Sequence, residues 1–476
     1  MATPQARLRE FLPNARELAL LFGARGIACI VAWLAGFRAL SDDDYARISI
    51  AQHFAHAVRF DPSRTSWLPA PFWAYGTAFH CFGTSLTVAR ATAIALSLCA
   101  TVLVYVAARM LGSSRLAALL SGVLSCVALR YSILLGLAAV PEVPCAALLL
   151  FSSATLVRRE AALRMLGGVS LILACLARYE AWPIALVFSL FCLWDAIRER
   201  RPSLAFSALL ALFGPALWLM VGRIEHGDAV FFIARVTAYR RALGGNQAST
   251  LSRLLVYPRL MVGEAFALCA LVLAAALAHR KDTARSKLPY GRCALAMLSM
   301  LAFLMLGSVR DGVPTHHASR VLLPIWYFGC IVAGAQLAVT RKGAHALLTI
   351  IASTPIALLL ARPNYDFASR SLELEAGNTA RVFGAHGLAI DTPDYGFFAV
   401  QAGFGSPIET SVLDDHDPRH PSTSPFSSAA VLDQALRQQS AHFAIVTLGH
   451  TGLLAPRCGE LWRNSAFALF RCADAP

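Results

Sequence analysis

Long apolar runs separated by short polar connections fill the first three quarters of the chain. A helix that crosses a bilayer needs roughly 20 apolar residues, and by that rule the pattern predicts about 11 spanning helices. The pattern is therefore that of an α-helical, polytopic membrane protein. The expected spans are 20–40, 86–109, 116–134, 139–157, 162–177, 181–197, 203–222, 258–279, 290–308, 320–340 and 344–361.

The connections between these runs alternate in chemical character. One set is short and basic, with segments such as "VRREAALR" and "IRERRP", and basic connections stay in the cytoplasm. The basic N-terminus is predicted to lie on the same, cytoplasmic side. The other set carries most clusters of carboxylates and aromatic side chains and is predicted to face outward. It comprises 41–85, 131–140, 178–182, 223–257 and 310–320.

The tail, residues 363–476, has the composition of a soluble domain. "GLAIDTPDYGFFAVQAGFG", "AHFAIVTLG" and "SAFALFRC" have the pattern of strands or of strand-turn-helix units, and "SSAAVLDQALRQQ" that of a helix. We therefore expect a membrane module over 1–362 and a small extracytoplasmic α/β domain over 363–476.

Composition agrees with the hydropathy pattern. Of the 476 residues, 57% are hydrophobic and only 15% are charged, whereas a soluble domain carries roughly a quarter charged residues. The net charge of +14 is divided among short basic clusters, so the sequence has no contiguous basic face for nucleic acid. The expected location is the plasma or inner membrane, with no nucleic-acid partner.

Most of the 12 cysteines lie inside apolar runs and are expected to be small buried hydrophobes. No pair has the C-x-x-C spacing of common zinc and thioredoxin sites. Cys458 and Cys472 differ because they lie in the polar tail. They are predicted to form a disulfide if the tail faces an oxidising compartment.

The first outward connection begins with three consecutive acids, Asp42, Asp43 and Asp44. The residues that follow have one apolar stripe at helical spacing, which predicts an interfacial helix. The acids would then lie at headgroup depth, at the N-terminus of that helix. The aromatic segment "WLPAPFWAYGTAFHCFG" suits the same depth.

A structural explanation accounts for part of this acidic run. Ser41 and Asp44 match a capping box, and Asp43 and Arg47 match an ion pair at i,i+4. A capping box needs only one acid, however. Three adjacent carboxylates repel each other unless a cation or a proton donor meets them, which favours a catalytic or binding role.

The sequence Asp43-Asp44-Tyr45, placed after the first predicted span, resembles the modified D-x-D motif of the GT-C superfamily of membrane glycosyltransferases. Its members include protein O-mannosyltransferases, aminoarabinose transferases of lipid A and GPI mannosyltransferases. Further segments are similar in order and sidedness over roughly residues 20–340. These are "WLPAPFWAYG", "LARYEAW", "HGDAVFFIARV" and "HHASRVLLP".

The resemblance implies an inverting transfer of a sugar from a polyprenyl phosphate to a lipid, glycan or protein acceptor at the outer membrane face. Asp43 would be the general base, with Asp42 and Asp44 orienting the acceptor or raising the pKa of the base. Members of the superfamily differ in whether they need Mg²⁺ or Mn²⁺. No closed set of metal ligands stands out in the sequence, and His316 and His317 are expected to be ordinary loop histidines.

Outward arginines are the candidates to bind the donor phosphate. For Arg178 the alternative is an ion pair with Glu180, and for Arg320 it is snorkelling to the interface. Arg310 is the third candidate. Arg235, Arg240 and Arg241 form a weaker set that is expected to track anionic headgroups. The candidate acceptor or substrate contacts are Tyr45, Glu142 and Glu180, with helix capping as the alternative for Glu142.

Two other functions remain open on the sequence alone. A transporter or flippase for lipid-linked sugars would have interrupted helices in two matching halves and ionisable residues near the bilayer midplane. A non-catalytic member of the superfamily would act as a scaffold. The concentration of charge at headgroup depth on one face favours the transferase.

Overall fold

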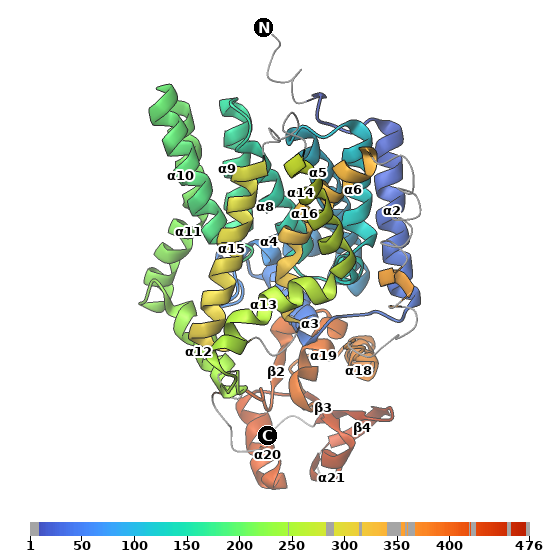
Figure 1. Ribbon diagram of the computed structural model, residues 1–476. Helices are drawn as coiled ribbons and strands as arrows, with labels where there is room; N and C mark the ends of the chain where they lie inside the picture. Colours follow the sequence, from blue (N-terminus) through green and yellow to red (C-terminus); the bar gives the residue numbers. More distant parts are fainter. Residues whose placement is uncertain are drawn as a thin grey trace.

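The computed structural model describes residues 9–245, 247–281, 290–313, 317–339, 354–357, 359, 367–417, 419, 425–454 and 458–472. A helical bundle occupies most of the chain, and a small domain built around a sheet caps one end of it (Figure 1). We call this the domain end of the bundle. The predicted fold class, a polytopic helical protein with a small C-terminal α/β part, is confirmed.

Among the described residues, six helical segments are long and apolar enough to cross a membrane, and a bent pair makes a seventh candidate. Three further apolar helices are shorter, namely α6 (Arg115–Val127), α8 (Glu142–Thr155) and α9 (Ala161–Cys175). The six are α2 (Ala15–Leu34), α5 (Leu86–Met110), α10 (Ala181–Glu199), α11 (Pro202–His226), α15 (Tyr290–Asp311) and the run formed by η1 (Ala318–Leu322) with α16 (Leu323–Val339).

The bent pair corrects one predicted span. The run 258–279 was expected to be one helix, but α13 (Thr250–Glu264) and α14 (Phe266–Lys281) meet at 89°. Glu264 interrupts the apolar run at this point, and its carboxylate accepts a hydrogen bond from Ser319 at 3.4 Å. The predicted span 344–361 lies almost wholly outside the described residues.

The predicted span 116–134 is also divided, into α6 and the short helix α7 (Arg130–Leu135). Beside this break lies a cation inside the bundle, Arg25 of α2, which is fully buried. Its guanidinium donates to the carbonyl oxygen of Ser132 at 2.7 Å and to the hydroxyl of Thr101 at 3.2 Å. A charge in this position is tolerated only with such partners.

The basic connections among the described residues, 111–114, 156–160 and 200–201, lie at the end of the bundle opposite the small domain (Figure 1). There Arg158 donates to the carbonyl oxygen of Arg109 at 3.3 Å, and Arg201 donates to that of Arg159 at 3.2 Å. The acid-rich connections lie at the domain end, where α8 and α10 begin. The expected separation of basic and acidic connections between the two ends therefore holds.

The acidic run opens α3 (Asp42–His56), which is followed by α4 (Ala70–Phe82). The sequence predicts that α3 is an interfacial helix, and in the structure the small domain packs on the side of α3 that carries Ser49 and Gln52. Ser49 donates to Gln401 at 2.9 Å, and the amide of Gln52 donates to the carbonyl oxygens of Thr84 and Ala402 at 2.9 and 3.0 Å. The polar face of α3 is thus a docking surface for the C-terminal domain.

The C-terminal domain has a five-stranded sheet with strand order β2-β1-β3-β5-β4. The first three strands in that order are parallel, and β5 and β4 run antiparallel to their neighbours. The strands are β1 (Leu388–Ile390), β2 (Thr410–Val412), β3 (Phe443–Thr447), β4 (Cys458–Arg463) and β5 (Phe467–Cys472).

Residue alternation along the strands explains the layers of the domain. Phe443 and Ile445 of β3 join the hydrophobic cluster that contains α18 (Ser371–Val382) and α19 (Phe397–Phe404). Ala444 and Val446 face the other way, into a cluster with α20 (Ala429–Gln438) and α21 (Thr451–Leu454). Both faces of the sheet are therefore covered, and α19 connects one of them to α3.

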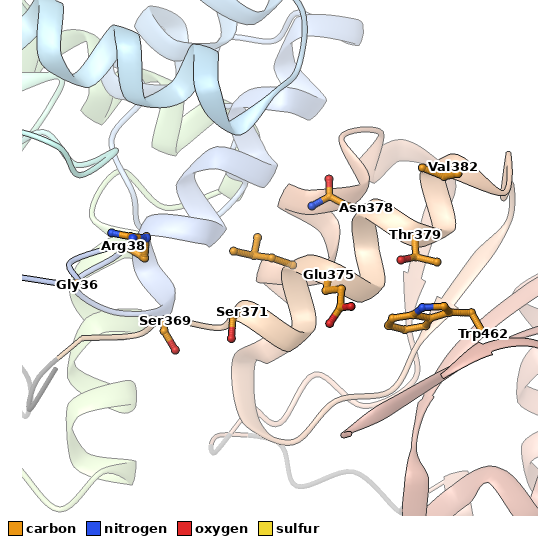
Figure 2. A pocket seen from close by; sticks show the side chains of 10 residues that line it. Gly36, Arg38, Ser369, Ser371, Glu375, Asn378, Thr379, Val382 and Trp462 are labelled. Atoms are coloured by element: carbon orange, nitrogen blue, oxygen red, sulfur yellow. The ribbon is translucent and has the colours of Figure 1, made fainter. Parts of the chain in front are cut away.

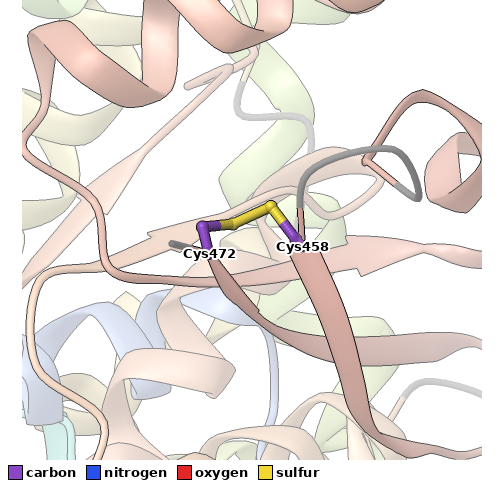
Figure 3. Close-up of a disulfide and its surroundings, with 2 residues drawn as sticks. All are labelled: Cys458 and Cys472. Atoms are coloured by element: carbon purple, nitrogen blue, oxygen red, sulfur yellow. A yellow bond between two sulfur atoms is a disulfide. The ribbon is translucent and has the colours of Figure 1, made fainter. Parts of the chain in front are cut away.

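Cys458 and Cys472 form a disulfide in the structure (Figure 3). They are directly paired residues on β4 and β5, the antiparallel pair at one edge of the sheet. The bond therefore ties the edge strand to its neighbour.

The packing of α18 on α19 predicts a stability effect at Gly377. A Cβ at this position would collide with the carbonyl oxygen of Val400 and lie 2.9 Å from the backbone nitrogen of Phe404. We expect Gly377→Ala to destabilise the domain by about 1–3 kcal/mol. The measurement is the rate of limited proteolysis of the domain in the full-length protein. Gly452→Ala, with no atom within 4 Å of the new Cβ, is the matched control and should be cleaved like the wild type.

Candidate active site

The first turn of α3 directs its three acids to three different environments. Asp44 points back to the helix start, where it accepts hydrogen bonds from the backbone N–H groups of Leu40 at 2.5 Å and Ser41 at 3.5 Å. Its side chain is buried, and burial raises its pKa to about 6 even though the bond from Leu40 and the charge of Arg320 oppose the shift. Asp44 is thus the acid that caps the helix.

Asp43 is the accessible acid, with 39% of its side chain exposed. Its Oδ2 accepts a hydrogen bond from Nη2 of Arg320 at 2.9 Å. Burial would raise the pKa of Asp43, but the positive charges of Arg320 and Arg47 outweigh burial and hold that pKa below its usual value. Asp43 is therefore a carboxylate at neutral pH.

Arg320 contacts a second carboxylate besides Asp43. Its Nε lies 3.3 Å from Oε1 of Glu142, the first residue of α8. The same carboxylate oxygen accepts a hydrogen bond from Nη1 of Arg178 at 2.5 Å. Arg178 in turn grips Glu180 with two parallel hydrogen bonds of 3.1 and 2.9 Å. The sequence allowed two interpretations of Arg178, an ion pair with Glu180 or a phosphate contact. In the structure Arg178 forms ion pairs with both Glu180 and Glu142.

The acids around Arg178 keep its guanidinium protonated. Burial would lower its pKa, but Glu180 and Glu142 offset burial and raise that pKa above its ordinary value. The pKa of Glu180 is correspondingly lowered, because Arg178 outweighs the effect of its burial. Oε2 of Glu142 is buried and accepts no hydrogen bond from the described residues.

Arg47 supplies a third guanidinium to this region. It is 7% exposed, and its guanidinium carbon lies 4.5 Å from the ring centroid of Trp67. The ion pair expected between Asp43 and Arg47 is replaced by that of Asp43 with Arg320. Among the described residues, Nε of Arg47 has no hydrogen-bond partner. We call Arg47, Arg178, Arg320, Asp43, Glu142 and Glu180 the ionic cluster.

Two residues assigned to substrate on the sequence hold the C-terminal domain instead. Arg370 donates to both carboxylate oxygens of Asp42 at 2.8 Å, and it also donates to Glu373 at 3.0 Å. The hydroxyl of Tyr45 donates to the carbonyl oxygens of Ala368 and Ser369, at 3.2 and 3.0 Å. Sequence analysis could not identify Arg370, because only the folded chain brings the tail to α3.

Other predicted residues lie outside the ionic cluster. Arg310 is 58% exposed at its side chain and pairs with the adjacent Asp311 at 2.6 Å. Arg240 donates to the carbonyl oxygen of Gly312 at 3.3 Å. The hydroxyl of Tyr131 lies 3.2 Å from Nδ1 of His317. The preceding histidine, 316, lies outside the described residues.

The helix α12 (Phe231–Ala242) adds a residue that the sequence analysis missed. Burial raises the pKa of Tyr239, a hydrogen bond with Tyr395 opposes this shift, and the negative charge of Asp43 adds to it. Tyr239 therefore lies within electrostatic range of Asp43, and Tyr395 of the C-terminal domain lies beside it. In the sequence analysis only the arginines of this segment were considered.

A groove of about 770 Å³ opens between the end of α2 and the C-terminal domain (Figure 2). Arg38 lies on one side of it, and Glu375 and Trp462 lie on the other. Ser369 and Ser371, which flank Arg370, also line it. The groove does not include the acids of α3, so it is distinct from the ionic cluster.

Comparison with solved structures identifies the fold. ArnT from Cupriavidus metallidurans bound to undecaprenyl phosphate matches with 13% identity and a TM-score of 0.65, over 96% of this chain and 98% of that chain. ArnT in the apo state gives 12% identity and a TM-score of 0.63, over 95% and 97%. Both matches extend over the bundle and the C-terminal domain. This chain has the GT-C fold.

A more distant GT-C structure agrees. The archaeal oligosaccharyltransferase AglB from Archaeoglobus fulgidus, in complex with an inhibitory peptide and a dolichol-phosphate, gives 14% identity and a TM-score of 0.51. The match covers 91% of this chain and 69% of that chain. No family model and no curated protein sequence matches the chain. At these identities the likeness describes the fold alone.

The raised pKa of Asp44 predicts a pH-dependent stability. Its pKa is about 6 in the folded chain against an ordinary value of 3.8. A carboxyl group whose pKa rises on folding stabilises the fold below its unfolded pKa and loses that contribution as pH rises through its folded pKa. Relative to Asp44→Asn, the wild type should lose thermal stability between about pH 4 and pH 6.

The measurement is the melting temperature of both purified proteins in detergent across this pH range. Acids elsewhere in the chain titrate in both proteins, so the difference between the two isolates Asp44. A difference that does not change with pH would contradict the assignment of the raised pKa.

Proposed function

We propose that the chain is a glycosyltransferase that moves a sugar from a polyprenyl phosphate to an acceptor hydroxyl at the domain end of the bundle. The observation that carries the proposal is the ionic cluster, which places a partly exposed carboxylate, Asp43, beside a half-buried guanidinium, Arg320. The solved GT-C structures support the lipid phosphate, because ArnT is bound to undecaprenyl phosphate and AglB to a dolichol-phosphate. In this proposal the domain end faces outward, as the basic connections at the opposite end suggest.

Accessibility selects the general base among the three acids. Asp42 accepts hydrogen bonds from Nε and Nη2 of Arg370. Asp44 is buried and accepts a hydrogen bond from the backbone N–H of Leu40. Asp43 has one carboxylate oxygen on Arg320 and an exposed side chain. An acceptor hydroxyl within hydrogen-bond distance of Asp43 would pass its proton to this carboxylate as the new bond forms.

The donor phosphate would bind the guanidiniums of Arg320 and Arg178. Arginine holds phosphate through paired, charge-assisted hydrogen bonds. The acceptor oxygen attacks the anomeric carbon of the sugar, the bond from that carbon to the phosphate oxygen breaks, and the electron pair leaves with the phosphate. Arg320 and Arg178 stabilise the resulting charge. A single displacement of this kind inverts the anomeric centre.

Arg320 also links donor binding to the strength of the base. While it contacts Asp43, it holds the pKa of that carboxyl low and makes it a weak base. A phosphate that draws Arg320 away would raise the pKa of Asp43 and strengthen the base. The enzyme would therefore activate its base only when donor is present.

The transporter alternative has less support from the described residues. The bend between α13 and α14 is one interrupted helix, and the described helices hold no matching second bend of this kind. Arg25 is an ionisable residue within a spanning helix, but it is fully buried and hydrogen-bonded to Ser132 and Thr101. An ion or substrate pathway would need such a residue to face a cavity.

Asp43→Asn tests the base directly. We expect turnover to fall by about 10²–10⁴-fold, because the amide cannot accept the acceptor's proton. The measurement is transfer of radiolabelled sugar from polyprenyl-phosphate sugars to candidate acceptors, with donor binding measured separately. Binding should persist, because Arg320 and Arg178 remain. Asp415→Asn, an exposed acid of the C-terminal domain, is the matched control and should keep full turnover.

Arg320→Met tests the phosphate contact. We expect donor affinity to fall by at least about tenfold, because a charge-assisted hydrogen bond is worth roughly 1.5–3 kcal/mol. Arg320→Lys keeps the charge without the planar fork and should be intermediate. Arg241→Met removes an exposed positive charge of α12 and should bind donor like the wild type. Equal donor affinity in all four proteins would rule out Arg320 as the phosphate ligand.

A further inference from the structure

Three side chains able to bind a metal converge outside the ionic cluster. Asp61 lies in the connection between α3 and α4, and Glu225 and His226 are the last two residues of α11. Each offers one ligand atom, and these atoms all lie within 4.8 Å of one another. Two segments far apart in the sequence thus bring one imidazole and two carboxylates to a single point.

The two carboxylate oxygens of Asp61 differ: Oδ1 accepts hydrogen bonds, and Oδ2 accepts none from the described residues. Its side chain has no exposed surface. Its Oδ1 accepts hydrogen bonds from the backbone N–H and the hydroxyl of Ser63, at 3.1 and 3.0 Å, and from the N–H of Arg64 at 3.0 Å. Its Oδ2 is buried and has no hydrogen-bond partner. Leaving a buried carboxylate oxygen unpaired costs free energy unless a ligand completes it.

In His226, Nε2 lies close to Oδ2 of Asp61. Its Nε2 is buried without a hydrogen-bond partner and lies 3.5 Å from Oδ2 of Asp61. Its ring stacks on Phe231 with a centroid separation of 3.8 Å and an interplanar angle of 16°. The stacking fixes the direction in which Nε2 points. Two buried atoms without a hydrogen-bond partner among the described residues thus lie next to each other, where one ion could contact both.

The separation of these atoms fits shared coordination better than a hydrogen bond. A charge-assisted N–H···O bond is about 2.7–2.9 Å long, well under the 3.5 Å seen here. Two ligands that each lie about 2.0–2.2 Å from a tetrahedral ion are about 3.3–3.6 Å apart. One imidazole nitrogen with two carboxylates suits zinc and similar transition ions, whereas Mg²⁺ and Ca²⁺ prefer oxygen alone.

We propose that Asp61, Glu225 and His226 bind one divalent transition-metal ion of the zinc type. The site would fasten the connection after α3 to the end of α11. That connection also carries Ser66, whose carbonyl oxygen accepts a hydrogen bond from Tyr179 at 2.9 Å, and Trp67, which lies under Arg47. The ion would therefore hold the loop that borders the ionic cluster, independently of whether the cluster is catalytic.

The test uses the full-length protein, purified without a histidine tag and stripped with a chelator. Zinc chloride is added at one equivalent, and bound metal is measured by mass spectrometry after desalting, together with the melting temperature. We expect about one zinc per chain and a raised melting temperature, as for any ligand that binds only the folded state. Magnesium chloride should raise the melting temperature much less.

Variants locate the ion. His226→Gln and Asp61→Asn should lose the bound zinc and its stabilising effect. Glu225→Gln changes an exposed side chain, so it should fold normally. The substitution should still weaken zinc binding. Loss of a residue that only supports a metal ligand weakens binding by roughly 10–100-fold, and loss of the ligand Glu225 should weaken it more. His56→Gln, an exposed histidine at the end of α3, is the matched control and should bind zinc like the wild type.

Two results would overturn the proposal. In the first, the stripped wild type retains no zinc, which would leave His226 and Asp61 as a simple ion pair. In the second, Glu225→Gln and His226→Gln bind zinc as tightly as the wild type, which would place the ion elsewhere. Neither result depends on sugar transfer, so a failure here is distinct from a failure of the proposed function.

Discussion

The pairing of buried charges is the constraint on which this structure depends. Burying a guanidinium or carboxylate costs several kcal/mol unless partners of opposite charge compensate it. Arg320 meets this requirement by bridging Asp43 of α3 to Glu142 of α8, and Arg178 extends the bridge to Glu180 before α10. Helices that would otherwise only pack apolar faces are thereby held in one arrangement at the domain end. The same interactions leave one carboxylate exposed and two guanidiniums able to exchange a partner for phosphate.

The helix α3 connects the two parts of the chain. Its first turn contributes Asp43 to the ionic cluster and Asp42 to the Arg370 fork of the C-terminal domain. Further along, Ser49 and Gln52 bond to the segment around α19. Any movement of the C-terminal domain would therefore act on the helix that carries the proposed base. The groove beside Arg38 and Trp462 lies where the domain meets the end of α2, and a shift of the domain would alter its width.

The sequence predicted the features that local pattern determines. The apolar runs, the separation of basic from acidic connections, the acidic N-terminus of α3 and the α/β tail all follow from residue type and spacing. It also singled out Asp43, Arg178, Glu180, Glu142 and Arg320, which the fold brings together. It predicted that Asp44 caps the helix, but it could not predict the partners of Asp42 and Asp43, because these lie far along the chain. Arg370 reaches Asp42, and Asp61 meets His226, only through the tertiary fold.

An experimental structure of the full-length protein with a bound polyprenyl phosphate would test the central claim most directly. The account predicts that the phosphate oxygens lie within hydrogen-bond distance of Arg320 and Arg178. It also predicts that Arg320 moves away from Asp43, whose carboxylate then faces the open side of the site. A phosphate bound away from both arginines, with the Asp43–Arg320 pair unchanged, would contradict it.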